Sequence, residues 1–461
     1  MAQQQKNGGL IAIITMFFLY AMIAFVTNLA APVGVIWKGQ FAGMNTVGML
    51  GNLMNFLAYL FMGIPAGKML INVGYKKTAL IGIAVGFIGV LTQFLSGVVA
   101  GNESANIVAF VIYLLGAFIC GFSVCMLNTV VNPMLNLIGG GGNRGNQLNL
   151  IGGTLNSLSG TMTPMLVGAL VGQVVTMSDV TAAKEIVVNG ATKVAEAADV
   201  TTFSQINPVL YIAMAVFAVA FIILNFIPIT EPAMGKASKD TKFEHSPWSF
   251  RHCKLGVIAI FVYVGVEIGI PSVLNLFISD ENAGGAGLLK AAEVGGSVAA
   301  TYWLLMLIGR LCSSFIANKV SSKMLMTVTT SLGMILIICA MLFGTSSSVS
   351  MPVFNASAFT FEMQTLPIAA LFLVLCGLCT SIMWSSIFNL ATEGLGKYTA
   401  AASGIFMMMV VGGGILPLFQ GFLADNIGYM LSYIVPLLAM AYMCWYAVVG
   451  SKNVNTDIPV E

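Results

Sequence analysis

Long apolar segments separated by short polar ones limit what this chain can fold into more than any other feature. Of its 461 residues, 58% are hydrophobic and only 8% are Asp, Glu, Lys or Arg. Soluble domains carry roughly 25% charged residues, so this chain has too few charges to face water over most of its surface. A helix needs about 20 apolar residues to cross a bilayer, and the segments have about that length. The sequence therefore predicts an all-α protein that crosses the lipid bilayer many times.

The apolar segments predict twelve transmembrane helices. The first segment has no small-residue cleavage site, so we expect a retained helix and not a signal peptide. A basic stretch at 230–254 divides the helices into six and six, which predicts an N-terminal half at 1–229, a linker, and a C-terminal half at 255–461. The predicted helices lie at 10–37, 45–70, 78–99, 107–135, 147–175, 207–229, 255–278, 295–317, 325–343, 367–390, 401–423 and 430–450.

The basic residues predict the orientation of these helices. Membrane proteins keep most Lys and Arg of their loops on the cytoplasmic side. If the N-terminus is inside, most of the 19 basic residues face the cytoplasm and Arg310 falls within a helix. The four that face outward are Lys38, Lys184, Lys193 and Lys290. We therefore expect a multi-pass membrane protein with both termini and the linker in the cytoplasm.

The two halves of the chain share short motifs at the same helix number. Cys120-Gly-Phe-Ser is similar to Cys376-Gly-Leu-Cys in the fourth helix of each half, and Pro164-Met-Leu-Val-Gly is similar to Pro417-Leu-Phe-Gln-Gly in the fifth. A duplicated six-helix unit predicts matches of this kind.

The loop after the second helix carries a recognisable pattern. Gly67 and Gly74 are seven residues apart and are followed by Lys76 and Lys77. The loop resembles the signature loop of the major facilitator superfamily, with Ile71 in place of the usual Asp. This resemblance implies two six-helix halves around a central cavity.

Three stretches of the C-terminal half are the most specific motifs in the chain. They are Phe261-Val-Tyr-Val-Gly-Val-Glu-Ile-Gly-Ile, Tyr302-Trp followed by Gly309-Arg, and Ser381-Ile-Met-Trp-Ser-Ser-Ile-Phe-Asn. They resemble helices 7, 8 and 10 of the fucose/glucose–galactose permease family within that superfamily, and weaker matches cover nearly the whole chain. The resemblance implies a transporter that imports a monosaccharide by alternating access.

Two asparagines stand where the proton-coupled fucose permeases of that family carry carboxylates. Alignment on Pro32 places Asn28 at the position of an Asp in helix 1, and alignment on Pro133 places Asn128 at the position of a Glu in helix 4. An amide does not titrate, so neither position can carry a proton in this chain.

Amide side chains in or near the predicted helices are the main candidates for binding a sugar. An amide both donates and accepts hydrogen bonds, as a sugar hydroxyl does. The alternative is that each amide only joins two helices, a contact worth roughly 0.6–2 kcal/mol. Aromatic residues such as Tyr20 could stack on the apolar face of a sugar. The predicted substrate-binding residues are Asn28, Asn128, Asn132, Asn149, Asn156, Glu267, Asn275, Trp384 and Asn389.

Glu267 is the one carboxylate near the middle of a predicted helix. A charge at the bilayer centre costs several kcal/mol unless it is paired or solvated, so such residues mostly face a cavity. Glu267 could carry a proton, bind a cation or accept a sugar hydroxyl, and we predict it to be the coupling residue. The alternative is an ion pair with Arg310 that locks two helices together, and Arg310 could equally belong to a gate.

The resemblance implies a hexose or deoxyhexose as the substrate and a proton or sodium ion as the coupling cation, and we expect a monomer without a cofactor or metal. The alternatives are an uncoupled sugar facilitator or an exporter of another small solute on the same fold. A sugar sensor is disfavoured because no sizeable soluble domain is present, and a channel because no charge rings are visible. The net charge of +2 gives no sign of nucleic-acid binding. The sequence shows no catalytic triad, so we do not expect an enzyme.

Overall fold

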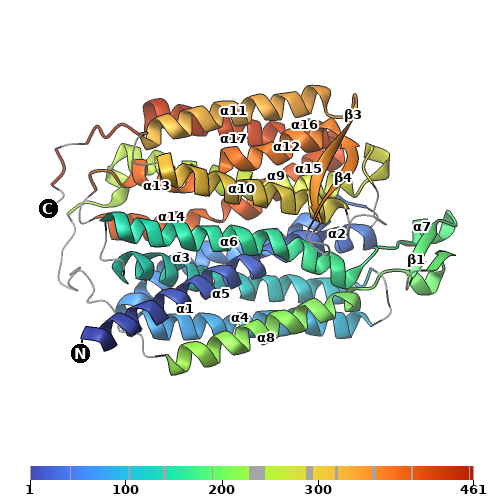
Figure 1. Ribbon diagram of the computed structural model, residues 1–461, viewed down its shortest axis with the longest axis horizontal. Helices are drawn as coiled ribbons and strands as arrows, with labels where there is room; N and C mark the ends of the chain where they lie inside the picture. Colours follow the sequence, from blue (N-terminus) through green and yellow to red (C-terminus); the bar gives the residue numbers. More distant parts are fainter. Residues whose placement is uncertain are drawn as a thin grey trace.

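The computed structural model shows long helices that run side by side along the longest axis of the molecule (Figure 1). Both chain termini lie at one end, which we call the terminal end. Four short strands lie at the opposite end, which we call the hairpin end. The structure describes residues 2–41, 43–101, 103, 105–138, 142–188, 191–227, 244–286, 294–316, 320–355, 360–395, 398–455 and 457–459.

The N-terminal half contains the helices α1 (Ala2–Asn28), α2 (Ala30–Gln40), α3 (Asn45–Val73), α4 (Tyr75–Ala100), α5 (Ile107–Ile138), α6 (Gly142–Val171), α7 (Met177–Thr181) and α8 (Asn207–Phe226). The C-terminal half contains α9 (Arg251–Ile278), α10 (Gly296–Ile316), α11 (Ser322–Phe343), α12 (Ile368–Thr380), α13 (Met383–Thr392), α14 (Thr399–Met409), α15 (Gly412–Ile427), α16 (Tyr429–Ser432) and α17 (Ile434–Trp445), which ends in a π-helical turn (Tyr446–Gly450).

These helices match the twelve predicted ones, with ends that differ by a few residues. Within the described residues, 11 segments are long and apolar enough to cross a membrane. The remaining predicted crossing is α6, whose Asn, Ser, Thr and Gly residues dilute its apolar ones. α6 packs against α1 and α10, and cover by protein allows a polar helix at this depth. The predicted all-α architecture is confirmed.

The segment that joins the halves is partly helical. α9 begins at Arg251, four residues before the predicted start of the C-terminal half at 255. A short 3₁₀ turn (Pro247–Ser249) precedes it. Residues 228–243, most of the predicted linker, lie outside the described residues.

Several of the described membrane-crossing segments are interrupted along their length. Leu29 separates α1 from α2 next to Pro32, whose nitrogen cannot donate to the carbonyl of Asn28. Residues 381–382 separate α12 from α13, and residues 410–411 separate α14 from α15. An interrupted helix leaves backbone N–H and C=O groups free to bind a ligand inside a membrane protein.

Two antiparallel hairpins at the hairpin end are additions to the predicted fold. β1 (Glu185–Val188) pairs with β2 (Ala191–Val194), and β3 (Ser348–Asn355) pairs with β4 (Thr360–Pro367). Residues 176–206 lie between two of the predicted helices, and the sequence predicts a loop there. Part of this segment instead forms β1 and β2, which project from the bundle with α7 (Figure 1). β3 alternates buried Met351 and Val353 with more exposed residues, the period of a half-covered strand.

Glycines allow α15 to cross between the halves at close range. A Cβ on Gly412 would lie 1.9 Å from the carbonyl oxygen of Phe261 on α9, and one on Gly414 would lie 2.9 Å from the Cα of Leu53 on α3. Only glycine permits such an approach of backbone to backbone. α15 therefore packs directly on α3 of the other half as well as on α9 of its own.

Candidate functional site

Four of the predicted amides gather around Tyr20 of α1. The Tyr20 hydroxyl donates to Oδ1 of Asn132 on α5 and lies 3.2 Å from Oδ1 of Asn149 on α6. Asn132 Nδ2 donates to the carbonyl of Asn128 at 2.9 Å, and Asn156 Nδ2 donates to the carbonyl of Tyr20 at 3.4 Å. Tyr20 is buried while the four amides stay partly exposed, so the ring fixes the cluster and the amides remain accessible. We call this group the amide cluster.

Tyr59 and Asn28 extend the polar surface of the N-terminal half. Asn128 Nδ2 donates to the hydroxyl of Tyr59 on α3 at 2.8 Å. Asn28 lies at the break between α1 and α2, where its Nδ2 donates to the carbonyl of Ala24 at 2.8 Å. The break therefore presents a partly exposed amide beside interrupted backbone.

The charged residues of the site lie on the C-terminal half. Arg310 Nη2 on α10 is 3.1 Å from Glu267 Oε1 on α9, and the two side chains are 16% and 14% exposed. Pairing offsets much of the cost of holding a charge at this depth. The pair is the contact that the sequence analysis gives as the alternative to a coupling role, but its partial exposure keeps both groups within reach of a ligand.

Arg310 also reaches across to the N-terminal half. Its Nη1 donates to the carbonyl of Gly153 at 2.9 Å and to Oγ of Ser157 at 2.8 Å, both on α6. Its Nε lies 3.4 Å from the carbonyl of Ser381, at the break between α12 and α13. One guanidinium therefore holds Glu267, a broken helix and the opposite half together, and the fork of donors on Arg suits such a junction.

A small cavity lies between the halves on the hairpin-end side of this junction. Asn28, Asn52, Ser272, Asn275 and Trp303 are among the residues that line it. Its volume of about 20 Å³ is enough for a water molecule and too small for a hexose. Asn275 is buried, and its Oδ1 has no hydrogen-bond partner within the described part of the chain. A buried acceptor left unpaired is costly, so this oxygen is suited to receive a donor from water or a ligand.

The two remaining candidates lie on α13. Trp384 is partly exposed and its ring centroid is 6.2 Å from that of Tyr263 on α9, one turn before Glu267. Asn389 is exposed and lies five residues nearer the terminal end. The structure therefore brings Trp384 to the Glu267 region, while Asn389 lies to one side of it.

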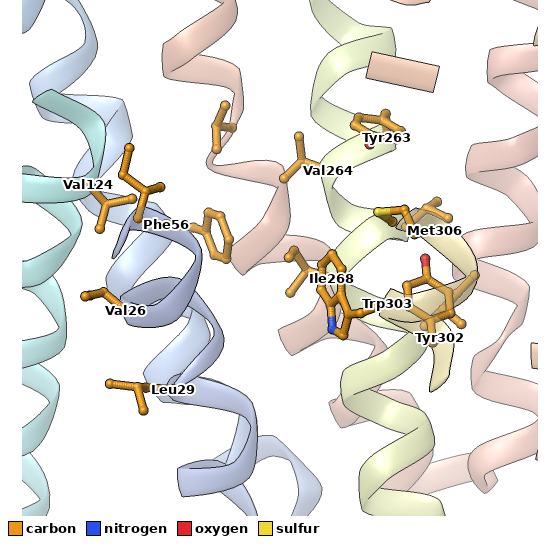
Figure 2. Close-up of a cluster of buried hydrophobic side chains, with 14 of the residues drawn as sticks. Val26, Leu29, Phe56, Val124, Tyr263, Val264, Ile268, Tyr302, Trp303 and Met306 are labelled. Atoms are coloured by element: carbon orange, nitrogen blue, oxygen red, sulfur yellow. The ribbon is translucent and has the colours of Figure 1, made fainter. Parts of the chain in front are cut away.

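Apolar side chains fill the space beside the polar groups. Figure 2 shows Phe56 of α3 pointing toward the side of α9 that carries Val264 and Ile268, with Trp303 of α10 beside Ile268. These four residues are at most 8% exposed. Val264 and Ile268 lie on the same helix as Glu267, and an apolar environment strengthens the attraction between opposite charges.

Several groups of the site were beyond the sequence analysis. Tyr20 is predicted as a stacking surface, but its hydroxyl organises the amides. Tyr59, Ser157 and the carbonyl of Gly153 carry no motif that would assign them. Ser157 and Arg310 are 153 residues apart, so only the packing of α6 against α10 brings them together.

Comparison with known proteins identifies the family. The family model described as Major Facilitator Superfamily matches residues 13–416. The chain belongs to the Major Facilitator Superfamily. It is therefore a multi-pass membrane transporter and not an enzyme.

Two relatives resemble this superfamily member over nearly its whole length. A "Glucose/galactose transporter" of Brucella abortus biovar 1 (strain 9-941) is 29% identical over 453 residues, which are 97% of this chain and 96% of the relative. The "L-fucose-proton symporter" of Escherichia coli (strain K12) is 22% identical over 440 residues, which are 94% of this chain and 91% of the relative.

Solved structures show that this transporter shares its fold with proteins of different substrates. A crystal structure of the E. coli fucose:proton symporter gives a TM-score of 0.66 at 17% identity and covers 97% of this chain and 100% of that one. The nucleoside transporter NupG gives 0.61 at 13% identity, with 95% and 98% covered. Since the fold serves both, the substrate must be argued from the site.

Proposed function

We propose that this chain carries a monosaccharide, a hexose or deoxyhexose, across the bacterial inner membrane by alternating access, coupled through Glu267 to a proton or sodium ion. The observation that carries the proposal is the amide cluster, which α6 connects to the Glu267–Arg310 pair of the opposite half. The halves at 1–229 and 255–461, joined by 230–254, would rock about this junction.

The amide cluster supports a polyhydroxylated substrate. Neutral amides offer donors and acceptors in equal measure, which matches sugar hydroxyls better than it matches an anion or a hydrophobic drug. The relatives named for glucose, galactose and fucose support the same class. The proposed binding set is Asn28, Asn128, Asn132, Asn149, Asn156, Glu267, Asn275, Trp384 and Asn389.

The Glu267–Arg310 pair supports coupling. A proton or sodium ion on Glu267 neutralises its charge and weakens its hold on Arg310, which then depends on Gly153, Ser157 and Ser381. A change of charge at Glu267 would thereby alter the contact between the halves. This is the link that a coupled transporter needs between cation binding and the movement of its halves.

The basic residues support an orientation with the terminal end in the cytoplasm. Lys184 follows α7 at the hairpin end, and Lys254 lies on the first turn of α9. Lys239, in the linker, lies outside the described residues. On intact cells, a membrane-impermeant thiol reagent should label Lys184→Cys and not Lys254→Cys, and the reverse pattern would invert the orientation.

Counterflow in proteoliposomes tests the proposed function. Vesicles preloaded with one unlabelled hexose, deoxyhexose, pentose or nucleoside are given the same compound in labelled form. We expect transient accumulation with at least one hexose or deoxyhexose and none with a nucleoside. Accumulation of the nucleoside alone would overturn the sugar assignment and leave the fold untouched.

A further inference from the structure

Lys38 is a buried cation at the hairpin end, on the last turn of α2. Its side chain is 3% exposed. Its Nζ donates to the carbonyl of Leu276 at 3.0 Å and to the hydroxyl of Tyr429 at 2.6 Å, and it lies 3.8 Å from Oδ2 of Asp280. An ammonium has three donors, and all three acceptors here belong to the C-terminal half. Lys38 is therefore fully engaged by the opposite half.

Asp425 makes a second bond between the halves at the same end. Its carboxylate accepts from the backbone N–H groups of Asn45 and Thr46 at 2.8 Å each and from the hydroxyl of Thr46. These are the first residues of α3, whose amide groups have no acceptor within the helix. A carboxylate from α15 thus caps the N-terminus of a helix in the other half, where the helix dipole favours a negative charge.

Tyr429 connects these two bonds into one network. Its hydroxyl lies 2.8 Å from Oδ1 of Asn45 and 3.0 Å from Oδ2 of Asp280, so it donates to one of them while it accepts from Lys38. The helices α3 and α9 that carry Asn45 and Leu276 also carry Asn52 and Ser272, which lie 3.3 Å apart across the halves and line the small cavity.

We propose that Lys38, with Asp425 and Tyr429, is the latch that holds the hairpin end of the transporter shut, and that its release admits the sugar from that side. The inference rests on the proposed alternating-access function and adds the residues that control one side of it. When the halves separate, Lys38 and Asp425 pass from protein partners to water. A charged latch can therefore open without leaving an unpaired buried charge, and its strength sets the fraction of closed molecules.

An exposed ion pair nearby provides a matched comparison. Lys184 Nζ lies 2.8 Å from Oε2 of Glu281 across the halves and 3.1 Å from Asp179, with Lys184 34% exposed. Its hydrogen bond to Glu281 raises the pKa of Lys184, so Lys184 stays charged at neutral pH. Exposed pairs contribute little, because water competes for both charges. Lys193 and Asp199, 2.7 Å apart within the N-terminal half, form a pair that crosses no interface.

The test measures how readily the hairpin end opens, without using a sugar. The eight native cysteines are first replaced, and Ser272→Cys is introduced as the reporter. A bulky, membrane-impermeant thiol reagent is then applied from the hairpin-end side. We expect Lys38→Met and Asp425→Asn each to speed labelling by about tenfold or more, since about 1.4 kcal/mol shifts an equilibrium tenfold. We expect Lys184→Met to change it by less than about twofold and Lys193→Met not at all.

The melting temperature of each purified variant separates opening from unfolding. If the latch exists, Lys38→Met is labelled faster although the variant stays folded. Its melting temperature should then lie well above the temperature of the labelling assay. Unchanged labelling in both Lys38→Met and Asp425→Asn would overturn the latch, as would equal acceleration in Lys193→Met. Since counterflow and labelling are independent, a failure of the sugar assignment leaves this result standing, and a failure of the latch leaves the sugar assignment standing.

Discussion

The two halves of this transporter contribute different chemistry to the junction between them. The N-terminal half offers neutral groups, with amides on α5 and α6 organised by Tyr20. The C-terminal half offers a carboxylate and a guanidinium on α9 and α10. Neutral amides can hold hydroxyls but cannot respond to a cation, whereas an ion pair can. Under the proposed function, the amide cluster of the N-terminal half holds the sugar together with residues of the C-terminal half, while the coupling group belongs to the C-terminal half alone.

Arg310 is where the two kinds of chemistry meet. It belongs to the C-terminal half but donates two of its hydrogen bonds to α6, the most polar membrane helix of the N-terminal half. Asn156 of the amide cluster lies next to Ser157 in that helix. A change at either side of the junction therefore reaches the other through one side chain.

Among the predicted changes, removal of Arg310 should have the largest effect, and it should act on the stability of the junction between the halves. Arg310→Met leaves Glu267 as an unpaired, largely buried carboxylate, which we expect to lower the free energy of unfolding by about 3–5 kcal/mol. The double variant Arg310→Met/Glu267→Gln should recover a large part of that loss, because no charge is then stranded. Thermal unfolding of the purified variants measures both. A double variant no more stable than Arg310→Met would mean that the ion pair is not what Arg310 stabilises.

Loss of a single amide should weaken binding while coupling persists. Asn132→Ala removes one of the two acceptors near the Tyr20 hydroxyl and one group offered to the sugar. We expect about 10- to 100-fold weaker sugar binding, or about 1–3 kcal/mol. At saturating sugar the variant should still accumulate substrate uphill. Thr129→Ala is the control, because Thr129 lies on the same helix and its hydroxyl donates to the carbonyl of Cys125 one turn away. Equal losses in both variants would point to a disturbed α5 instead of a lost contact.

Asn389 should show the smallest effect of the proposed binding residues. It lies exposed on α13, away from the amide cluster and five residues from Trp384. We expect Asn389→Ala to change the sugar affinity by less than about threefold, or about 0.6 kcal/mol. Titration of labelled sugar against the purified variant measures this. A loss as large as that of Asn132→Ala would move the centre of the site toward the terminal end and away from the junction described here.

The sequence predicted the fold well because apolar length is a strong signal in a membrane protein. The crossing helices follow from the need to satisfy every backbone group inside lipid, so α6 was found even though its Asn and Gly residues make it polar. The β1–β2 and β3–β4 hairpins were missed, because residues outside the bilayer are not held to that requirement. α9 begins at Arg251, so the last four residues of the predicted linker at 230–254 belong to that helix.

The site was predictable as a set of residues but not as an arrangement. Amides and a lone carboxylate inside apolar helices are unusual enough to be noticed from sequence. Which of them meet depends on helix packing, so the gathering around Tyr20 and the reach of Arg310 to Ser157 could not be derived. The Lys38 network was hidden for a further reason. Lys38 was counted as an ordinary loop charge, and only the approach of α9 and α16 buries it.

Two activities of Glu267→Gln test the division between the halves most directly. They are the exchange of sugar across the membrane and the accumulation of sugar against its gradient. Both are measured in proteoliposomes with an imposed proton or sodium gradient. The amide cluster is intact in this variant, so exchange across the membrane should persist, while accumulation against a gradient should be lost because the glutamine cannot take up the cation. If Glu267→Gln still concentrates sugar as the wild-type chain does, coupling does not reside in the C-terminal ion pair, and the account is wrong.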